Sequence, residues 1–271
     1  MKPLSREEAE FLTKMERVWK RHDEEKICAI LPHLGRVNSL LDIGCGSGQI
    51  LKGLSKRVPK LVGVDENEER LKDAARNCPE ARLMRAKAEE LKFHEEFDVV
   101  VTSQMLHEVK QFGTAGQMDV VLRVIWNALK LGGRYFLLDH LDPGEGKVVI
   151  RASGQTEELL REFKAKFRYR RVYLKKLGPC IYEIEKRDLQ DFVTKTWSFN
   201  SPMEDMEMNE THAPFDRKEV EAIVRRAGFS PKQFIPFTNM EDDLKDYHRI
   251  ELKGKTSPWD RKFLLISSKP K

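Results

Sequence analysis

A short apolar run that ends in closely spaced glycines is the feature that most constrains the fold. Residues 39–43 (Ser-Leu-Leu-Asp-Ile) predict a buried strand, and the chain then passes into Gly44-Cys45-Gly46-Ser47-Gly48. Glycines allow a tight turn and let a ligand lie directly against the backbone. The helix predicted over residues 49–57 would point its free N–H groups toward that ligand. The turn therefore predicts a binding site at the end of this strand.

Strands and helices alternate regularly through the first half of the chain. The predicted strands are residues 39–43, 60–64, 81–85, 97–102 and 134–138. The predicted helices between them are residues 49–57, 68–77 and 116–129. After a break, residues 216–227 predict a further helix, and residues 232–237 and 261–267 predict two last strands. Such alternation implies an α/β fold with a doubly wound, mostly parallel, seven-stranded sheet that helices cover on both faces.

The interruption of this alternation divides the chain into four expected segments. Residues 1–34 form an N-terminal helical cap, and residues 35–142 form a Rossmann-like ligand-binding core. Residues 143–213 form a largely helical insertion after the fifth strand. Residues 214–271 complete the core with its last helix and two strands.

Composition excludes several classes of protein. No run of about 18 apolar residues is present, so no transmembrane helix is expected. The polar start of the chain lacks the apolar stretch of a secretory signal, which favours a cytoplasmic protein. Cys28, Cys45, Cys78 and Cys180 are scattered without histidine partners, so neither a disulfide framework nor a metal site is expected.

The spacing of the glycines argues against two common nucleotide sites. Gly48 comes one place too early for the dinucleotide pattern G-x-G-x-x-G, and no Lys-Ser/Thr pair of a phosphate-binding loop follows. Asp65, at the end of the second strand, lies 23 positions after Asp42. A carboxylate there can accept both hydroxyls of a ribose. The alternative role for Asp65 is an ordinary helix cap.

Five segments in order resemble the successive motifs of class I S-adenosylmethionine-dependent methyltransferases. They are Asp42-x-Gly44-x-Gly46-x-Gly48, Val64-Asp65, Ala86-Lys87-Ala88-Glu89, Phe97-Asp98-Val99-Val100-Val101 and Leu129-Lys130-Leu131-Gly132-Gly133. More narrowly, they resemble the small-molecule group that includes the ubiquinone and menaquinone methyltransferases. The resemblance covers residues 35–141 and, more weakly, residues 214–268. It implies the Rossmann-like methyltransferase fold and S-adenosylmethionine as cofactor.

The resemblance also implies roles for the matched positions. Asp42 and the turn Gly44, Cys45, Gly46 and Gly48 would hold the methionine moiety. Asp65 would bind the ribose, with Glu66 beside the adenine. Lys87, Ala88 and Glu89 would lie along the adenine, and Ser103 and Gln104 near the sulfonium. Lys87 departs from the family, which commonly has an aspartate there, because lysine cannot accept a bond from the adenine amino group.

Methyl transfer from a sulfonium leaves a faint catalytic signature in a sequence. The reaction is a direct displacement, so alignment and exclusion of water matter most, and a base is needed only for an acceptor that arrives protonated. His107 follows the fourth strand and His140 ends the fifth, where ligands of open α/β sheets bind. His212 lies at the end of the insertion. Each has an alternative role, His107 and His140 in packing or capping and His212 in a solvated loop.

The acceptor is the least constrained part of the prediction. Residues 151–195 contain 12 Lys and Arg against 7 Asp and Glu, and residues 168–173 interleave arginines with tyrosines. This segment is consistent with an anionic small substrate, with RNA, or with a solvated helix face. We expect a small-molecule acceptor beneath residues 143–213. The alternatives are an RNA methyltransferase and a non-catalytic S-adenosylmethionine-binding partner subunit.

Overall fold

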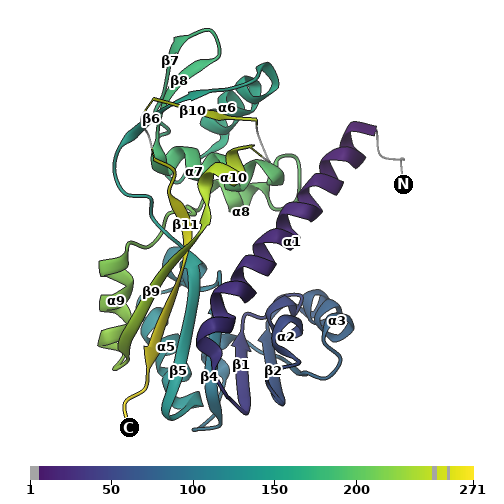
Figure 1. Ribbon diagram of the computed structural model, residues 1–271, viewed down its shortest axis with the longest axis vertical. Helices are drawn as coiled ribbons and strands as arrows, with labels where there is room; N and C mark the ends of the chain where they lie inside the picture. Colours follow the sequence, from purple (N-terminus) through teal and green to yellow (C-terminus); the bar gives the residue numbers. More distant parts are fainter. Residues whose placement is uncertain (1–5, 246–248, 255–256) are drawn as a thin grey trace. The chain divides into compact units, whose positions relative to one another are not determined.

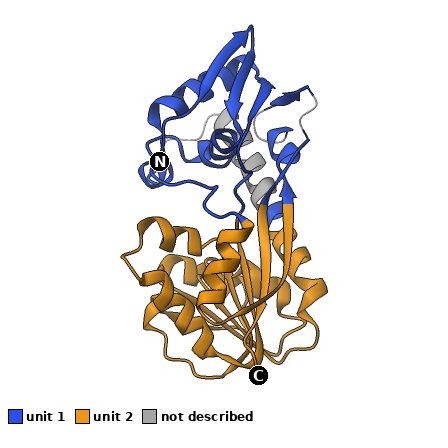
Figure 2. Ribbon diagram, turned by 90° about the vertical axis from the view of Figure 1, so that its left-hand side faces the viewer, with its two compact units in different colours: residues 1–22, 141–216, 238–261 blue, residues 23–140, 217–237, 262–271 orange. Residues whose placement is uncertain are grey.

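The computed structural model describes residues 6–245, 249–254 and 257–271, and it divides the chain into two compact units (Figure 2). Unit 2 comprises residues 23–140, 217–237 and 262–271, and unit 1 comprises residues 1–22, 141–216 and 238–261. The first five residues of the predicted N-terminal segment lie outside the described part. Each unit has its own sheet and its own apolar core.

The sheet of unit 2 confirms the predicted seven-stranded, mostly parallel architecture. Its strands are β1 (Ser39–Ile43), β2 (Lys60–Asp65), β3 (Arg82–Arg85), β4 (Phe97–Ser103), β5 (Leu129–His140), β9 (Ser230–Asn239) and β11 (Asp260–Ser268). Their order is β3-β2-β1-β4-β5-β11-β9. The first five are parallel neighbours, and β11 runs antiparallel to β5. Strands β1, β2, β4 and β5 lie side by side in Figure 1.

Helices cover both faces of this sheet, as the alternation predicted. They are α1 (Arg6–Leu34), α2 (Gln49–Leu54), α3 (Glu68–Asn77), α4 (Leu106–Phe112), α5 (Gln117–Ala128) and α9 (Arg217–Arg226), with the short 3-10 helix η1 (Ala88–Glu90). Phe136 of β5 belongs to the cluster that contains Ile30 and Leu34 of α1. Its neighbour Tyr135 packs against Phe229, which follows α9, on the other face. Consecutive side chains of β5 thus pack on opposite faces of the sheet, each toward its own layer of helices.

One predicted boundary is wrong, because β5 begins at Leu129 and not after the Gly132-Gly133 pair. Gly132 has a φ of +73°, and the pairing register with β4 shifts between Phe97 and Val99. The backbone nevertheless stays paired here, since Gly132 and Gly133 exchange hydrogen bonds with Lys269. The glycines therefore produce an irregularity within the strand and do not end it.

The insertion is not largely helical, and this expectation is also wrong. It contains α6 (Gly154–Lys166), α7 (Lys186–Lys195), the 3-10 helix η2 (Thr196–Ser198) and α8 (Glu204–Met208), but also β6 (Lys147–Arg151), β7 (Leu174–Gly178) and β8 (Ile181–Glu185). These strands join β10 (Glu251–Lys253) in an antiparallel sheet of order β10-β6-β8-β7. In β6, Val148 and Ile150 are buried, Val149 between them is half-buried and the two end residues are exposed, which is close to the period-two pattern of a half-buried strand.

Unit 1 has an apolar core of its own. The apolar cluster joins Ile150 and Ile184 of the sheet to Phe163 of α6 and Phe192 of α7, and Met240 of α10 (Met240–Asp243) completes it. None of the helices in the described part of the chain is long and apolar enough to span a membrane.

Candidate functional site

The glycine turn between β1 and α2 has the tight geometry that its sequence predicts. Gly44, Gly46 and Gly48 have φ angles of +74°, +52° and +75°, a region that L side chains rarely adopt. The turn is anchored to β2, because the N–H groups of Gly44 and Cys45 both donate to the Val64 carbonyl, over 2.8 and 3.0 Å. Gly48 is also needed for packing, since a Cβ there would lie 3.0 Å from the Cβ of Ala74.

Asp42, near the end of β1, carries the least satisfied charge beside this turn. Its side chain is 1 % exposed, and neither carboxylate oxygen has a hydrogen-bond partner among the described residues. Burial raises the pKa of Asp42 to about 7, against the opposing charge of Lys26. A buried carboxylate without a partner is costly. The site therefore fits a ligand that brings a cationic hydrogen-bond donor, such as the ammonium of an amino acid.

Asp65, at the end of β2, faces the same turn and is hydrogen-bonded. Its Oδ2 accepts the N–H of Gly46 over 2.8 Å, and its Oδ1 accepts the N–H of Asn67 over 2.9 Å. Asp65 is not the cap of α3, because the side chain of Asn67 caps that helix. Each carboxylate oxygen has a second lone pair. Asp65 can therefore hold the turn and still accept hydroxyl groups.

The remaining positions on this side of the site differ in exposure. Glu66 and Lys87 are exposed, while Ala88 and Glu89 of η1 are half-buried. Glu89 accepts a hydrogen bond from Gln117 of α5 over 3.3 Å. Cys45 is buried, and this burial raises the pKa of its thiol, so Cys45 offers its backbone and a neutral side chain.

Beyond β4, the chain makes a strained turn. Gln104 has a φ of +53°, which is uncommon for a residue with a side chain. Its backbone N–H donates to Leu138 of β5 over 2.9 Å, and its side-chain Nε2 lies 3.0 Å from Nε2 of His140. The hydroxyl of Ser103 is buried and has no partner among the described residues. Ser103 and Gln104 thus present polar groups at the carboxyl end of β4.

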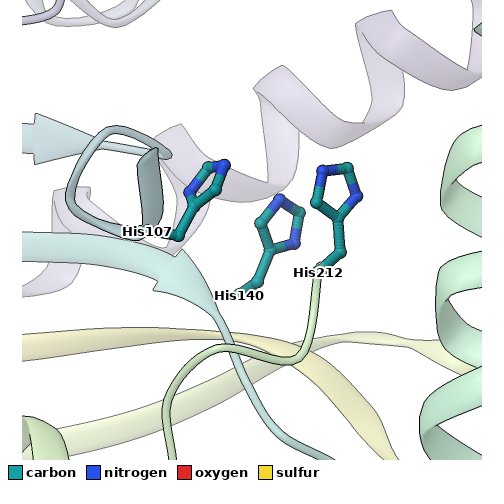
Figure 3. Close-up of side chains that lie close together, drawn as sticks. All are labelled: His107, His140 and His212. Carbon is teal, nitrogen blue, oxygen red and sulfur yellow. The ribbon is translucent and has the colours of Figure 1, made fainter. Parts of the chain in front are cut away.

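His107 and His140 meet at this edge of the sheet, as their positions after β4 and β5 predicted (Figure 3). Their ring centroids lie 5.0 Å apart with an interplanar angle of 74°. His107 is in the first turn of α4, and His140 is the last residue of β5. Both side chains are buried.

Asp139 stands beside His140 at the predicted strand end, but the sequence did not indicate its partner. It precedes His140 in β5, and its Oδ1 lies 2.7 Å from Nδ1 of His107. Its Oδ2 accepts the backbone N–H of His107 over 3.1 Å, and Oδ1 accepts that of His140 over 2.8 Å. The available signal was an acid at the carboxyl end of a central strand. The partner could not be read from the sequence because 32 positions separate it from His107.

His212 lies in unit 1, on the segment that links α8 and α9, and it is not in a solvated loop. It is 8 % exposed, and its Nε2 lies 3.2 Å from Oε1 of Glu210. Burial and the charge of Lys195 lower the pKa of His212. Glu207, Glu210 and His212 offer atoms close enough together to hold a cation. The ammonium of Lys195 already lies 3.1 Å from Glu207 and 3.4 Å from Glu210, so a cationic group already neutralises these acids.

Comparison with known sequences identifies the segment around the glycine turn. Residues 41–137 match the sequence model of a methyltransferase domain family. An uncharacterized methyltransferase of Synechocystis sp. is 37 % identical over 101 residues, which are 37 % of this chain and 46 % of that protein. The chain thus matches about half the length of this curated relative.

Comparison with solved structures extends the likeness of the fold to nearly the whole chain. An S-adenosylmethionine-dependent methyltransferase of Thermotoga maritima, described as a possible histamine N-methyltransferase, is 16 % identical, with 96 % of both chains covered and a TM-score of 0.54. An S-adenosylmethionine-dependent methyltransferase of Mesorhizobium loti is 14 % identical, with 90 % of this chain and 95 % of that chain covered and a TM-score of 0.53. At such low identity, the likeness concerns the fold alone.

Proposed function

We propose that this chain, whose residues 41–137 belong to the class I S-adenosylmethionine-dependent methyltransferase family, transfers a methyl group from S-adenosylmethionine to a small-molecule acceptor. One observation carries the proposal. Asp42 is a buried carboxylate without a partner in the described part of the chain, and it lies beside a turn of three positive-φ glycines. The ammonium of the methionine moiety would supply the missing partner.

The cofactor contacts follow from the two acids and the turn. We assign Asp42 and the backbone of Gly44, Cys45, Gly46 and Gly48 to the methionine moiety. Asp65 keeps a lone pair on each oxygen for the ribose hydroxyls, beyond its bonds to Gly46 and Asn67. We assign Glu66, Lys87, Ala88 and Glu89 to the adenine side, and Ser103 and Gln104 to the sulfonium side.

The chain's own residues then bind and align the reactants. When bound, S-adenosylmethionine supplies an electrophilic methyl group on its sulfonium. The glycine turn and the two acids hold the cofactor at the carboxyl edge of the sheet, where His107 and His140 also lie. His107 would remove a proton from the acceptor, and His140 would contact it. Most of the rate enhancement would come from alignment and from exclusion of water.

We propose that residues 143–213, including His212, determine which acceptor is bound. The connectivity of the chain supports this proposal, since β5 ends at His140 and the chain continues directly into this segment. A substrate lid at this place would order on binding and exclude water. The possible histamine methylation of the Thermotoga protein makes a small amine a sensible first probe for this chain.

The contacts of one arginine favour the small-molecule acceptor over the alternative of an RNA acceptor. Arg170, the central residue of the basic 168–173 segment, bonds Asp188 over 2.9 Å and Asp191 over 2.6 Å. Arg168 also has an acidic partner, Asp205. Arg170, whose two acidic partners are buried, is poorly available for phosphate, whereas the Arg168–Asp205 pair is exposed. The alternative of a non-catalytic S-adenosylmethionine-binding partner subunit would also keep Asp42 and Asp65. The buried contact between His107 and Asp139, which cofactor binding alone does not need, favours a catalytic role.

Calorimetric titration of S-adenosylmethionine into the full chain tests the assignment of the cofactor site. Asp65→Asn keeps one acceptor oxygen for the turn but removes the charge and the second acceptor, so affinity should fall about tenfold or more. Glu68→Gln, an exposed residue of α3, is the matched control and should bind as the wild type does. Equal affinity of Asp65→Asn and wild type would refute the ribose assignment.

A further inference from the structure

Asp139 organises the acceptor side of the site, where it has three contacts at once. Its side chain is fully buried, it accepts the backbone N–H groups of His107 and His140, and its Oδ1 lies 2.7 Å from Nδ1 of His107. The bond to the His107 backbone also satisfies one of the free donors in the first turn of α4. Asp139 therefore fixes both the start of α4 and the ring of His107.

These contacts define which nitrogen of His107 can act as a base. Both oxygens of Asp139 already accept backbone N–H groups, so this carboxylate acts as an acceptor toward Nδ1 of His107 as well, and that nitrogen carries a proton. A neutral imidazole has one N–H group, and its lone pair is then on Nε2. If Nε2 takes a proton, the resulting imidazolium lies 2.7 Å from the Asp139 carboxylate, which stabilises it.

A second contact gives His140 a different role. The side-chain amide nitrogen of Gln104 donates hydrogen bonds, and it lies 3.0 Å from Nε2 of His140. That nitrogen of His140 is therefore engaged as an acceptor by Gln104. The ring of His107, in contrast, has the carboxylate of Asp139 to support it as a base.

We infer that Asp139 positions His107 as the general base of the reaction, and that the acceptor is a small molecule whose nucleophilic nitrogen or oxygen arrives protonated. This inference rests on the proposed function. An acceptor that needs no deprotonation, such as a tertiary amine, would make the buried Asp139–His107 pair unnecessary. A nucleophile that ionises readily by itself, such as a thiol, would gain little from it.

The step balances in atoms and electrons. The acceptor's nitrogen or oxygen forms a bond to the methyl carbon while the carbon–sulfur bond breaks, and that electron pair stays on sulfur as a neutral thioether. The proton of the acceptor passes to Nε2 of His107, and the imidazolium later returns it to water. Asp139 exchanges no proton in this step and acts only through His107.

The test begins with a series of acceptors and radiolabelled S-adenosylmethionine. Catechol and histamine carry protonated oxygen or nitrogen nucleophiles, whereas N,N-dimethylaniline has no such proton and thiophenol ionises unaided. We expect methylation of catechol or histamine and of neither other compound. Transfer only to the other two, or to none of the four while S-adenosylhomocysteine binds, would overturn the inferred acceptor class. Failure of S-adenosylhomocysteine to bind would instead refute the proposed function.

Variants of the pair then separate a base from a packing residue. His107→Gln should lower kcat by about 100-fold or more with KM for S-adenosylmethionine nearly unchanged. His94→Gln, at an exposed histidine, is the control and should be fully active. Asp139→Asn removes the charge that stabilises the imidazolium, so the acidic limb of the pH–rate profile should move to lower pH. Loss of structure alone would lower the rate without moving that limb.

A spectroscopic measurement covers the case in which Asp139→Asn is too unstable for kinetics. Nitrogen-15 NMR of the wild-type histidines, assigned by comparison with His107→Gln, reports which ring nitrogen carries the proton. We expect Nδ1 of His107 to be protonated and Nε2 to be bare at high pH. The opposite tautomer would overturn the inferred role of Asp139.

Discussion

Asp42 is a buried acid whose ionisation is unfavourable until a cation is bound. Burial raises its pKa from the ordinary value of 3.8 to about 7. At a pH between these two pKa values, Asp42 holds a proton in the folded chain and has lost it in the unfolded chain. Ionisation of Asp42 therefore destabilises the ligand-free protein progressively as pH rises from about 4, and fully above pH 7. The same ionisation should favour binding of the cationic cofactor.

These two effects predict opposite consequences of Asp42→Asn. Without cofactor, the variant should have a higher Tm than the wild type at pH 8, and the difference should shrink as pH falls toward 4. Affinity for S-adenosylmethionine should fall about tenfold or more, because a charge-assisted hydrogen bond is lost. Wild-type affinity should rise with pH through about 7, and that of the variant should not. A lower Tm of the variant at pH 8, with unchanged affinity, would contradict this account.

Individual residues were predictable where a local motif dictates their conformation. The glycine turn and the placement of His107 and His140 at strand ends followed from the sequence, because both depend on near neighbours. The link between His107 and Asp139 did not, since it joins α4 to β5 across the sheet edge. The burial of His212 was also missed, although its acidic partner Glu210 lies only two positions before it.

At the scale of elements, the end of α1 depends on a residue of the sheet. Arg134 of β5 donates to the carbonyls of His33 and Leu34, the last residues of that helix. It thereby satisfies two carbonyls that lack partners within the helix. Arg134 also lies over the ring of Phe136.

Arg134→Ala should therefore lower the free energy of unfolding by about 1.5–3 kcal/mol, the range for hydrogen bonds to a charged group. Thermal unfolding followed by circular dichroism measures the effect as a lower Tm. Arg134→Lys keeps the charge and can still donate to one of the two carbonyls, so the free energy of unfolding should fall less than in Arg134→Ala. An unchanged Tm for Arg134→Ala would show that these carbonyls do not need this partner.

A similar argument applies to Arg170 in unit 1. Its guanidinium joins Asp188 and Asp191 of α7 to the hydroxyl of Thr211. Because both acids are buried, Arg170→Ala would leave them uncompensated and should cost about 3–5 kcal/mol. Arg171→Ala, at the exposed neighbouring position, should leave Tm unchanged. Equal Tm values for the two variants would contradict the structural role of Arg170.

The elements of the core were predictable because their apolar periods are regular, and those of the insertion were less so. Strands β6 and β8 are only five residues long, and in the sequence each is followed almost at once by a helix of the insertion. The partner of β6 on its other side, β10, comes about 100 positions later in the chain. Pairings between distant segments of a sequence leave no local signal.

At the scale of the whole molecule, the net charge of +5 does not identify a nucleic-acid partner. Gel-shift titration should show no binding of total RNA at low salt, the condition in which contacts to phosphate are strongest. Arg171→Ala combined with Lys175→Ala, both at exposed positions, should change nothing. Strong, salt-sensitive RNA binding that this pair weakens would revive the RNA acceptor. Arg170 is unsuitable for this test because its loss should destabilise unit 1.

The central claim is that the glycine turn receives S-adenosylmethionine and not a dinucleotide. Calorimetric titration of the full chain with S-adenosylhomocysteine and, separately, with NAD tests it most directly. We predict that S-adenosylhomocysteine binds with one site per chain and that NAD gives no binding heat under the same conditions. Binding of NAD without binding of S-adenosylhomocysteine would contradict the account.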